Sequence, residues 1–171
     1  MAGSTVKAFV LSVVLLGPTL VWSAESSPDA SFYKDLAEGG LAEVNAGNLA
    51  QEKSSDAKIK EFAAMMVKDH SAANDKLKSL AESKAVKLPA SPSLSQQATE
   101  AKLKVLSGES FDHSYIRGQV SAHQDTVKLL NKELASGQDA EAKAFAKSIL
   151  PTVRQHLKAA KALAASEGVS K

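Results

Sequence analysis

The amino-acid sequence predicts an all-α protein, a four-helix bundle with an extra short helix between the second and third main helices. Apolar residues recur at alternating intervals of three and four over four long stretches, which is the period of amphipathic helices. Ala, Lys, Leu and Glu dominate the chain beyond residue 24, and all four are good helix formers. No stretch alternates apolar and polar residues as a half-buried strand would.

Residues 1–24 are expected to be a signal peptide and not part of the bundle. Lys7 gives a weakly positive start, residues 8–21 are nearly all apolar, and the small residues Ser23 and Ala24 follow. The apolar run is shorter than the about 20 residues that a membrane-spanning helix needs, which disfavours an anchor. We therefore expect export to the periplasm or cell envelope, with cleavage after Ser23 or Ala24 and residues 25–171 forming one helical domain.

The composition narrows the classes of function. The chain has no cysteine, so it has neither disulfides nor a thiolate metal site. Lys7 is the only charged residue among the first 24, which leaves 20 Lys and Arg against 19 Asp and Glu beyond them. This nearly balanced charge argues against a nucleic-acid partner, which would need a basic patch. A protein partner in the envelope stays open, and the sequence does not indicate an oligomeric state.

The first two helices are predicted over residues 31–53 and 56–85, with Ser54 and Ser55 as N-cap residues of the second. The short link between them predicts an antiparallel hairpin. Their inward stripes are Phe32, Leu36, Gly39, Glu43, Ala46 and Ala50 in the first, and Ile59, Phe62, Met66, His70, Ala73, Leu77 and Leu80 in the second.

The segment 86–110 contains two prolines in its first part, which predict a loop. Residues 93–106 then form the extra short helix, with Leu94, Leu103 and Leu106 as its apolar positions. Two paths are open for this segment. It either crosses the length of the bundle or folds back on one side.

The last two main helices are predicted over residues 111–135 and 139–165, again as an antiparallel hairpin. Ser110 and Asp112 are predicted cap residues, and Gly137 is predicted to end the third main helix in a left-handed conformation. The inward stripes are Ile116, Val120, His123, Val127, Leu130 and Leu134 in one, and Ala142, Phe145, Ile149, Val153, His156, Ala160 and Leu163 in the other.

Four polar residues occupy stripes that should face the core, namely Glu43, His70, His123 and His156, one on each main helix. A polar group buried without a partner costs several kcal/mol on apolar-transfer scales. Distances along the helices, at about 1.5 Å per residue, put all four within roughly two turns of one level. We therefore expect them to cluster, so that they satisfy one another or share an ion.

Three imidazoles and one carboxylate form a complete ligand set for one divalent transition metal, with Zn, Fe, Cu, Ni and Mn as candidates. Asp69, Gln119 and Gln155 are near enough in sequence to fix imidazole tautomers. The alternative is a metal-free polar network that specifies the core arrangement of a structural or interaction protein of the cell envelope.

Several stretches of the chain carry a family resemblance. They are Ala42-Glu43-Val44 with Leu49-Ala50, Phe62-Ala63 with Met66-Val67-Lys68-Asp69-His70, Gly108 to Tyr115 with His123, and Phe145-Ala146 with Leu150-Pro151 and His156. In order and spacing the chain resembles the bacterial domain-of-unknown-function family 4142. This resemblance implies a ferritin-like helical fold and export, but no settled activity.

The sequence departs from di-iron ferritins, which carry Glu-x-x-His on two helices. Val67, Val120 and Val153 precede the three core histidines by three residues, so the bridging carboxylates are missing. This pattern disfavours an oxygen-activating di-iron centre. The chain also lacks a G-x-S-x-G motif, an H-E-x-x-H motif and a phosphate-binding loop, so an enzyme is the least favoured class.

Overall fold

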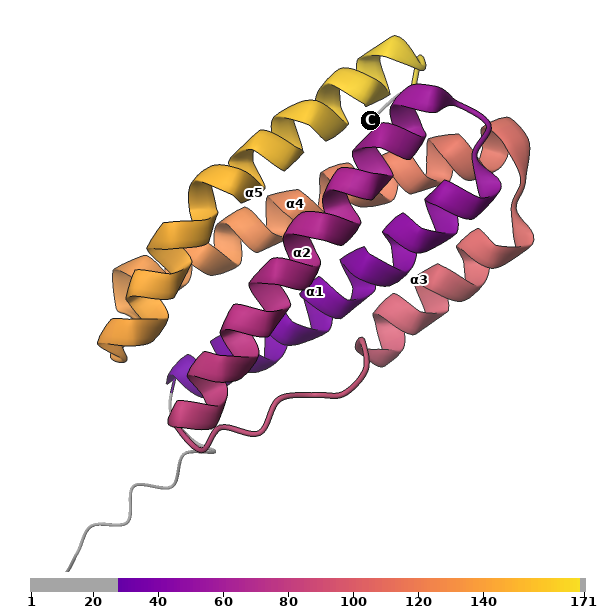
Figure 1. Ribbon diagram of the computed structural model, residues 1–171. Helices are drawn as coiled ribbons and strands as arrows, with labels where there is room; N and C mark the ends of the chain where they lie inside the picture. Colours follow the sequence, from indigo (N-terminus) through magenta and orange to yellow (C-terminus); the bar gives the residue numbers. More distant parts are fainter. Residues whose placement is uncertain (1–27, 170–171) are drawn as a thin grey trace, which may run out of the picture.

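Five α-helices make up most of the computed structural model, which describes residues 28–169 (Figure 1). They are α1 (Pro28–Lys53), α2 (Ala57–Ser83), α3 (Leu94–Val105), α4 (Gly108–Ser136) and α5 (Ala140–Ser166). The predicted all-α class is confirmed, with four long helices and a short one after the second. The predicted signal peptide, residues 1–24, lies outside the described residues. No helix within residues 28–169 has the length and apolar character needed to span a membrane.

The path of the segment between α2 and α4 is settled by contacts at both ends of the bundle. Lys53 Nζ donates a hydrogen bond of 2.6 Å to the carbonyl of Lys104, which places the end of α3 beside the α1–α2 link. At the other end, Lys84 Nζ lies 3.1 Å from Asp139 Oδ1, which places the end of α2 beside the α4–α5 link. The segment therefore crosses the length of the bundle, and α2 and α4 run in the same direction, as in ferritin-like folds.

The core consists of two apolar clusters, one toward each end of the bundle. The first includes Phe32, Leu36, Leu77, Leu130 and Val153, together with their buried neighbours. The second, at the α1–α2 link, includes Ala50, Ile59, Met66, Ile116 and Ala160. Each of the four polar core residues falls in sequence between members of the two clusters. A polar layer therefore separates two apolar ones.

The N-cap of α2 differs from the prediction. Asp56 is the cap residue, and its Oδ1 accepts hydrogen bonds from the backbone N–H groups of Lys58 and Ile59 at 2.8 and 2.9 Å. The prediction of Ser54 and Ser55 was wrong because the helix begins at residue 57, where a carboxylate is in position to accept from two free N–H groups. Ser54 instead accepts from the backbone N–H of Asp56 at 3.1 Å.

The two ends of α4 also correct the prediction. The helix begins at Gly108, whose φ of 53° only a glycine adopts easily, so Ser110 and Asp112 lie inside the helix and are not caps. At the other end Gly137 has φ −62° and ψ 147°, so the predicted left-handed cap is wrong. Glycine suits this position for another reason, because a Cβ there would lie 2.2 Å from Glu133 Oε1.

Candidate metal centre

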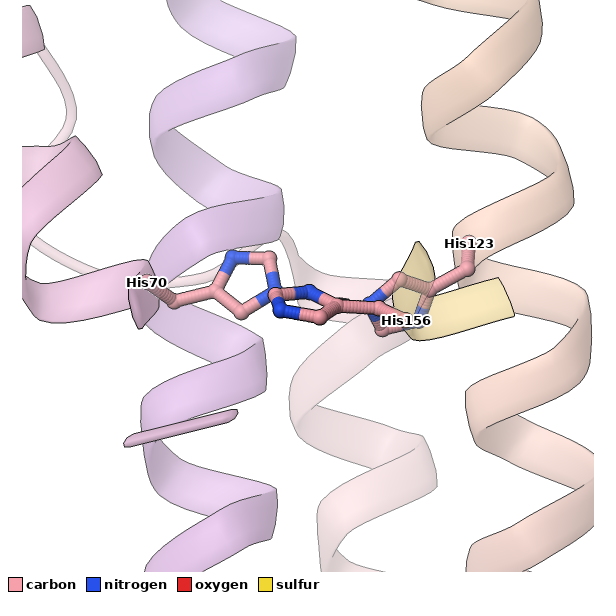
Figure 2. A group of neighbouring side chains, drawn as sticks. All are labelled: His70, His123 and His156. Carbon is pink, nitrogen blue, oxygen red and sulfur yellow. Dashed lines mark hydrogen bonds between the residues drawn. The ribbon is translucent and has the colours of Figure 1, made fainter. Parts of the chain in front are cut away.

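Three histidine side chains converge between the helices. His70 comes from α2, His123 from α4 and His156 from α5, and Figure 2 shows their rings reaching toward one another. One potential ligand nitrogen from each lies within 4.8 Å of the other two. The Nε2 atoms of His70 and His123 are 3.4 Å apart, and the three ring centroids are separated by 5.4 to 5.5 Å.

The burial of these rings follows from their places in the helical stripes. His123 is 1% exposed and His156 is 2% exposed, while His70 is half-buried. A cavity of about 390 Å³ adjoins His70 and His156, and exposed residues of α2 and α5 also line it, so these rings are within reach of solvent. Small solutes can therefore approach the triad although the rings themselves are largely covered.

The orientation of His123 is fixed from within its own helix. Its Nδ1 lies 2.9 Å from the backbone carbonyl oxygen of Gln119, one turn earlier on α4. A carbonyl oxygen only accepts hydrogen bonds, so Nδ1 carries the proton and donates it. The lone pair of His123 is therefore on Nε2, the atom that faces His70.

His156 is held from the opposite hairpin by Asp69. Its Nε2 lies 3.0 Å from Asp69 Oδ2, a carboxylate oxygen that accepts the N–H. The lone pair then belongs to Nδ1. This nitrogen is buried and has no hydrogen-bond partner within residues 28–169. Carboxylate–histidine pairs of this kind commonly orient a metal-binding imidazole in proteins.

Glu43 is buried but does not join the three histidines. Its Oε2 accepts a hydrogen bond of 2.7 Å from Gln119 Nε2, and its Oε1 lies 3.9 Å from His123 Nδ1. The carboxyl group thus approaches His123 at the nitrogen that does not face His70. The structure brings three of the four predicted site residues together and places the fourth behind one of them.

Burial dominates the electrostatics of the site. It lowers the pKa of His70 to about 3 and that of His123 to about 4, with neighbouring imidazoles adding to the effect. Both rings are therefore neutral at ordinary pH, the form that binds metal ions. Burial also raises the pKa of Glu43 to about 7, although the hydrogen bond from Gln119 opposes the shift.

Two of the three residues predicted to support the site do contact it. Gln119 and Asp69 contact His123 and His156, whereas Gln155 is exposed. Asp69 is the neighbour of His70 in the chain, but its partner, His156, is on α5. Little in the sequence indicates that Asp69 pairs with His156. Successive residues of a helix point about 100° apart, so Asp69 and His70 point in different directions. Which residue Asp69 meets then depends on how α2 packs on α5.

Comparison with known proteins identifies the family. The sequence profile of a family described as domain of unknown function DUF4142 matches residues 22–163. The chain belongs to the DUF4142 family. No protein of curated function matches the sequence of this DUF4142 protein.

Several solved structures share the fold of this DUF4142 protein. A DUF305 protein from Streptomyces coelicolor superposes with a TM-score of 0.73 at 15% identity, covering 86% of this chain and 98% of that one. A DUF305 fragment from Deinococcus radiodurans gives 0.69 at 16% identity, over 80% and 95%. CopM in the Cu(I)-bound form gives 0.67 at 16% identity, over 81% and 96%. CopM is also similar in an Ag-bound form obtained by soaking. Such low identities show a common fold and nothing more.

Proposed function

We propose that this exported helical bundle binds one transition-metal ion through His70, His123 and His156. The observation that carries the proposal is the convergence of three imidazoles on one point, with potential ligand atoms within 4.8 Å of one another. Export rests on the signal peptide predicted over residues 1–24. It agrees with the Streptomyces coelicolor neighbour, which is described as a candidate secreted protein.

The spacing of the nitrogens supports this assignment. A tetrahedral ion with Zn–N bonds of about 2.0–2.1 Å holds its nitrogens about 3.3–3.4 Å apart. The Nε2 atoms of His70 and His123 already have this separation, at 3.4 Å. The third imidazole has to move by about 1.5 Å at most, since no two of the potential ligand atoms are more than 4.8 Å apart.

The donor set favours Zn²⁺ or copper. Imidazole suits both ions, and three histidines leave one coordination position for water. CopM, which shares the fold, has been solved with Cu(I) and with Ag. Met66, one turn before His70, belongs to an apolar cluster. We therefore propose a divalent ion, with Zn²⁺ and Cu²⁺ as first candidates and Cu⁺ tested beside them.

Metal-free protein should melt at a higher temperature when a metal is added. At a free metal concentration of 100 times Kd, binding adds about 2.7 kcal/mol to stability, which raises the Tm of a domain this size by several degrees. His70→Ala should abolish the shift. His113→Ala is the matched control, because His113 lies on α4 outside the triad. No shift with Zn²⁺, Cu²⁺, Cu⁺, Ni²⁺, Fe²⁺ or Mn²⁺ would rule out the proposal.

A substitution at Glu43 tests whether its carboxylate binds the metal ion directly. From its place behind His123 we propose that it positions that ring, whereas the sequence predicted a fourth ligand. With Co²⁺ as the probe, Glu43→Gln should lower affinity by about 10- to 100-fold and leave the visible absorption bands of the bound ion in place. A change in the position or intensity of those bands would instead identify Glu43 as a ligand.

The second candidate function is a metal-free structural or interaction role in the cell envelope. The bonds of Gln119 to Glu43 and of Asp69 to His156 favour it, because they satisfy much of the layer without an ion. This candidate predicts that His123→Leu keeps the fold or stabilises it, and that no metal shifts the Tm.

A further inference from the structure

A cavity of about 550 Å³ lies between α1, α3 and α4, beside the triad but separate from it. Glu43 and Gln119 line it, and none of the three histidines does. α3 forms the outer wall through Thr99, Glu100 and Leu103. The volume lies within the range of small-molecule binding sites.

Two glycines hold this space open. Gly39 on α1 and Gly118 on α4 both line the cavity, and a Cβ built at either would meet no atom of the described residues within 4 Å. Glycine inside a helix costs roughly 0.5–1 kcal/mol relative to alanine. Close packing explains Gly47, where a Cβ would lie 3.0 Å from the Ala63 carbonyl oxygen, but it does not explain these two.

Polar atoms without partners are buried beside the cavity. Tyr115 is 1% exposed and Gln119 is 3% exposed, and both line the cavity. The Tyr115 hydroxyl and Gln119 Oε1 have no hydrogen-bond partner within residues 28–169. Together with the carboxyl group of Glu43 they offer three oxygen acceptors. An ammonium group has three N–H donors and no acceptor, so it complements this set.

The charge of the lining also favours a cation. It contains Asp35, Glu43, Glu100 and Asp125 and no lysine, arginine or histidine. Glu100 and Asp125 already pair with lysines, whereas no ion pair of Asp35 occurs within the described residues. Asp35 and Glu43 are eight residues apart on α1, about 12 Å along its axis. A single metal ion cannot contact both, but a linear amine can.

We propose that this cavity binds a linear aliphatic amine with an ammonium group at each end. The inner ammonium bonds to Glu43, Gln119 Oε1 and the Tyr115 oxygen, and the outer one faces Asp35. The carbon chain lies along the apolar side chains of the wall between the two carboxylates, which include Ala42, Ala122 and Leu129. This site does not depend on a metal at the triad.

The test is calorimetric titration of the metal-free protein, kept in a chelator, with the linear diamine 1,8-diaminooctane. We expect binding with a Kd below about 1 mM. Gly118→Leu, which fills the cavity, and Asp35→Asn, which removes the outer carboxylate, should each weaken binding at least about tenfold. Asp75→Asn is the charge-matched control, because Asp75 is exposed on α2 outside this cavity and should leave binding unchanged.

Three results would overturn the proposal. The first is no heat of binding in the wild type, and the second is wild-type affinity for the amine in both Gly118→Leu and Asp35→Asn. The third is that the wild type binds neutral 1,8-octanediol as tightly as it binds the amine. Circular dichroism must show that Gly118→Leu remains helical, and Asp35→Asn keeps the test decisive if it does not. His70→Ala should still bind 1,8-diaminooctane. Loss of metal binding in that variant therefore bears on the proposed function alone.

Discussion

Single residues determine which ring nitrogen of each histidine is free to bind an ion. Asp69 is about one third exposed, and it is the group that holds His156 Nε2, leaving Nδ1 for an ion. A carboxylate in this position fixes the ring and makes it a better donor to the metal. On this side of the site, therefore, one acidic side chain, Asp69, orients one buried imidazole, that of His156.

Asp69→Asn should weaken binding of Zn²⁺ by about 10- to 100-fold, since an amide orients the ring less firmly and adds no negative charge. The measurement is competition against a chelator of known affinity, at fixed pH. Asp75→Asn removes an equal charge from the same helix and should leave the affinity within about twofold. Equal losses in the two variants would mean that Asp69 acts only through overall charge.

At this scale the sequence predicts which residues enter the core but not which atoms meet. The three-four stripe correctly placed Glu43, His123 and His156 inside. It could not predict that Glu43 would approach His123 from behind, because that depends on how closely α1 packs on α2 at Gly40 and Gly47. A Cβ at either position would overlap Asn74 or Val67. Close approach of two backbones is not visible in a stripe of apolar residues.

The link between α4 and α5 joins the ends of several helices. Asp139 caps α5, accepts a hydrogen bond of 3.1 Å from the Tyr33 hydroxyl and pairs with Lys84. Asp29 accepts from the backbone N–H of Gln138 at 2.9 Å, so the start of α1 is tied to the same link. Sequence patterns predicted the helices well here, but these long-range contacts depend on which ends the crossover brings together.

Glu133 lies in this cluster and should make stability depend on pH. Burial, with Asp29 and Asp139 nearby, raises its pKa to about 7 from a usual value near 4.5, although Lys143 opposes the shift. The folded state therefore favours the protonated form. Its contribution to stability is complete below about pH 4.5 and is lost as pH rises through about 7, a change of about 3 kcal/mol.

Glu133→Gln should remove this dependence. The free energy of unfolding of the variant, relative to wild type, should rise by about 3 kcal/mol between pH 4.5 and 8. Urea unfolding of both proteins across that range measures the difference, in which Glu43 and the histidines cancel. Glu61→Gln, an exposed change on α2, should show no such trend. A constant difference at all pH values would show that Glu133 ionises normally in the folded protein.

For the whole molecule, periodicity predicted four long helices and two hairpins, but not the path between them. Of the three leucines assigned to the short helix region, only Leu103 is buried, and Leu94 is 85% exposed. So few apolar anchors cannot select a crossover from sequence alone. The cavity beneath α3 was equally hidden, because it depends on the absence of side chains at two glycines on different helices.

The two hairpins meet through the polar layer. The contacts His70 to His123, Asp69 to His156 and Glu43 to Gln119 each join the α1–α2 hairpin to the α4–α5 hairpin. An ion at the triad would take one ligand from the first hairpin and two from the second. Metal binding should therefore hold the two hairpins together at the level between the two apolar clusters.

Amide hydrogen exchange of the metal-free and Zn²⁺-loaded protein tests this coupling. Exchange should slow on both sides of the layer, around residues 66–74 of α2 and around residues 119–127 and 152–160 of α4 and α5. α3 provides an internal control, because it contributes no ligand. If Zn²⁺ slowed exchange in α4 and α5 alone, the ion would be held by two histidines of one hairpin. His70→Ala should show no Zn²⁺-dependent slowing in any helix, since it removes the ligand that the first hairpin supplies and with it metal binding.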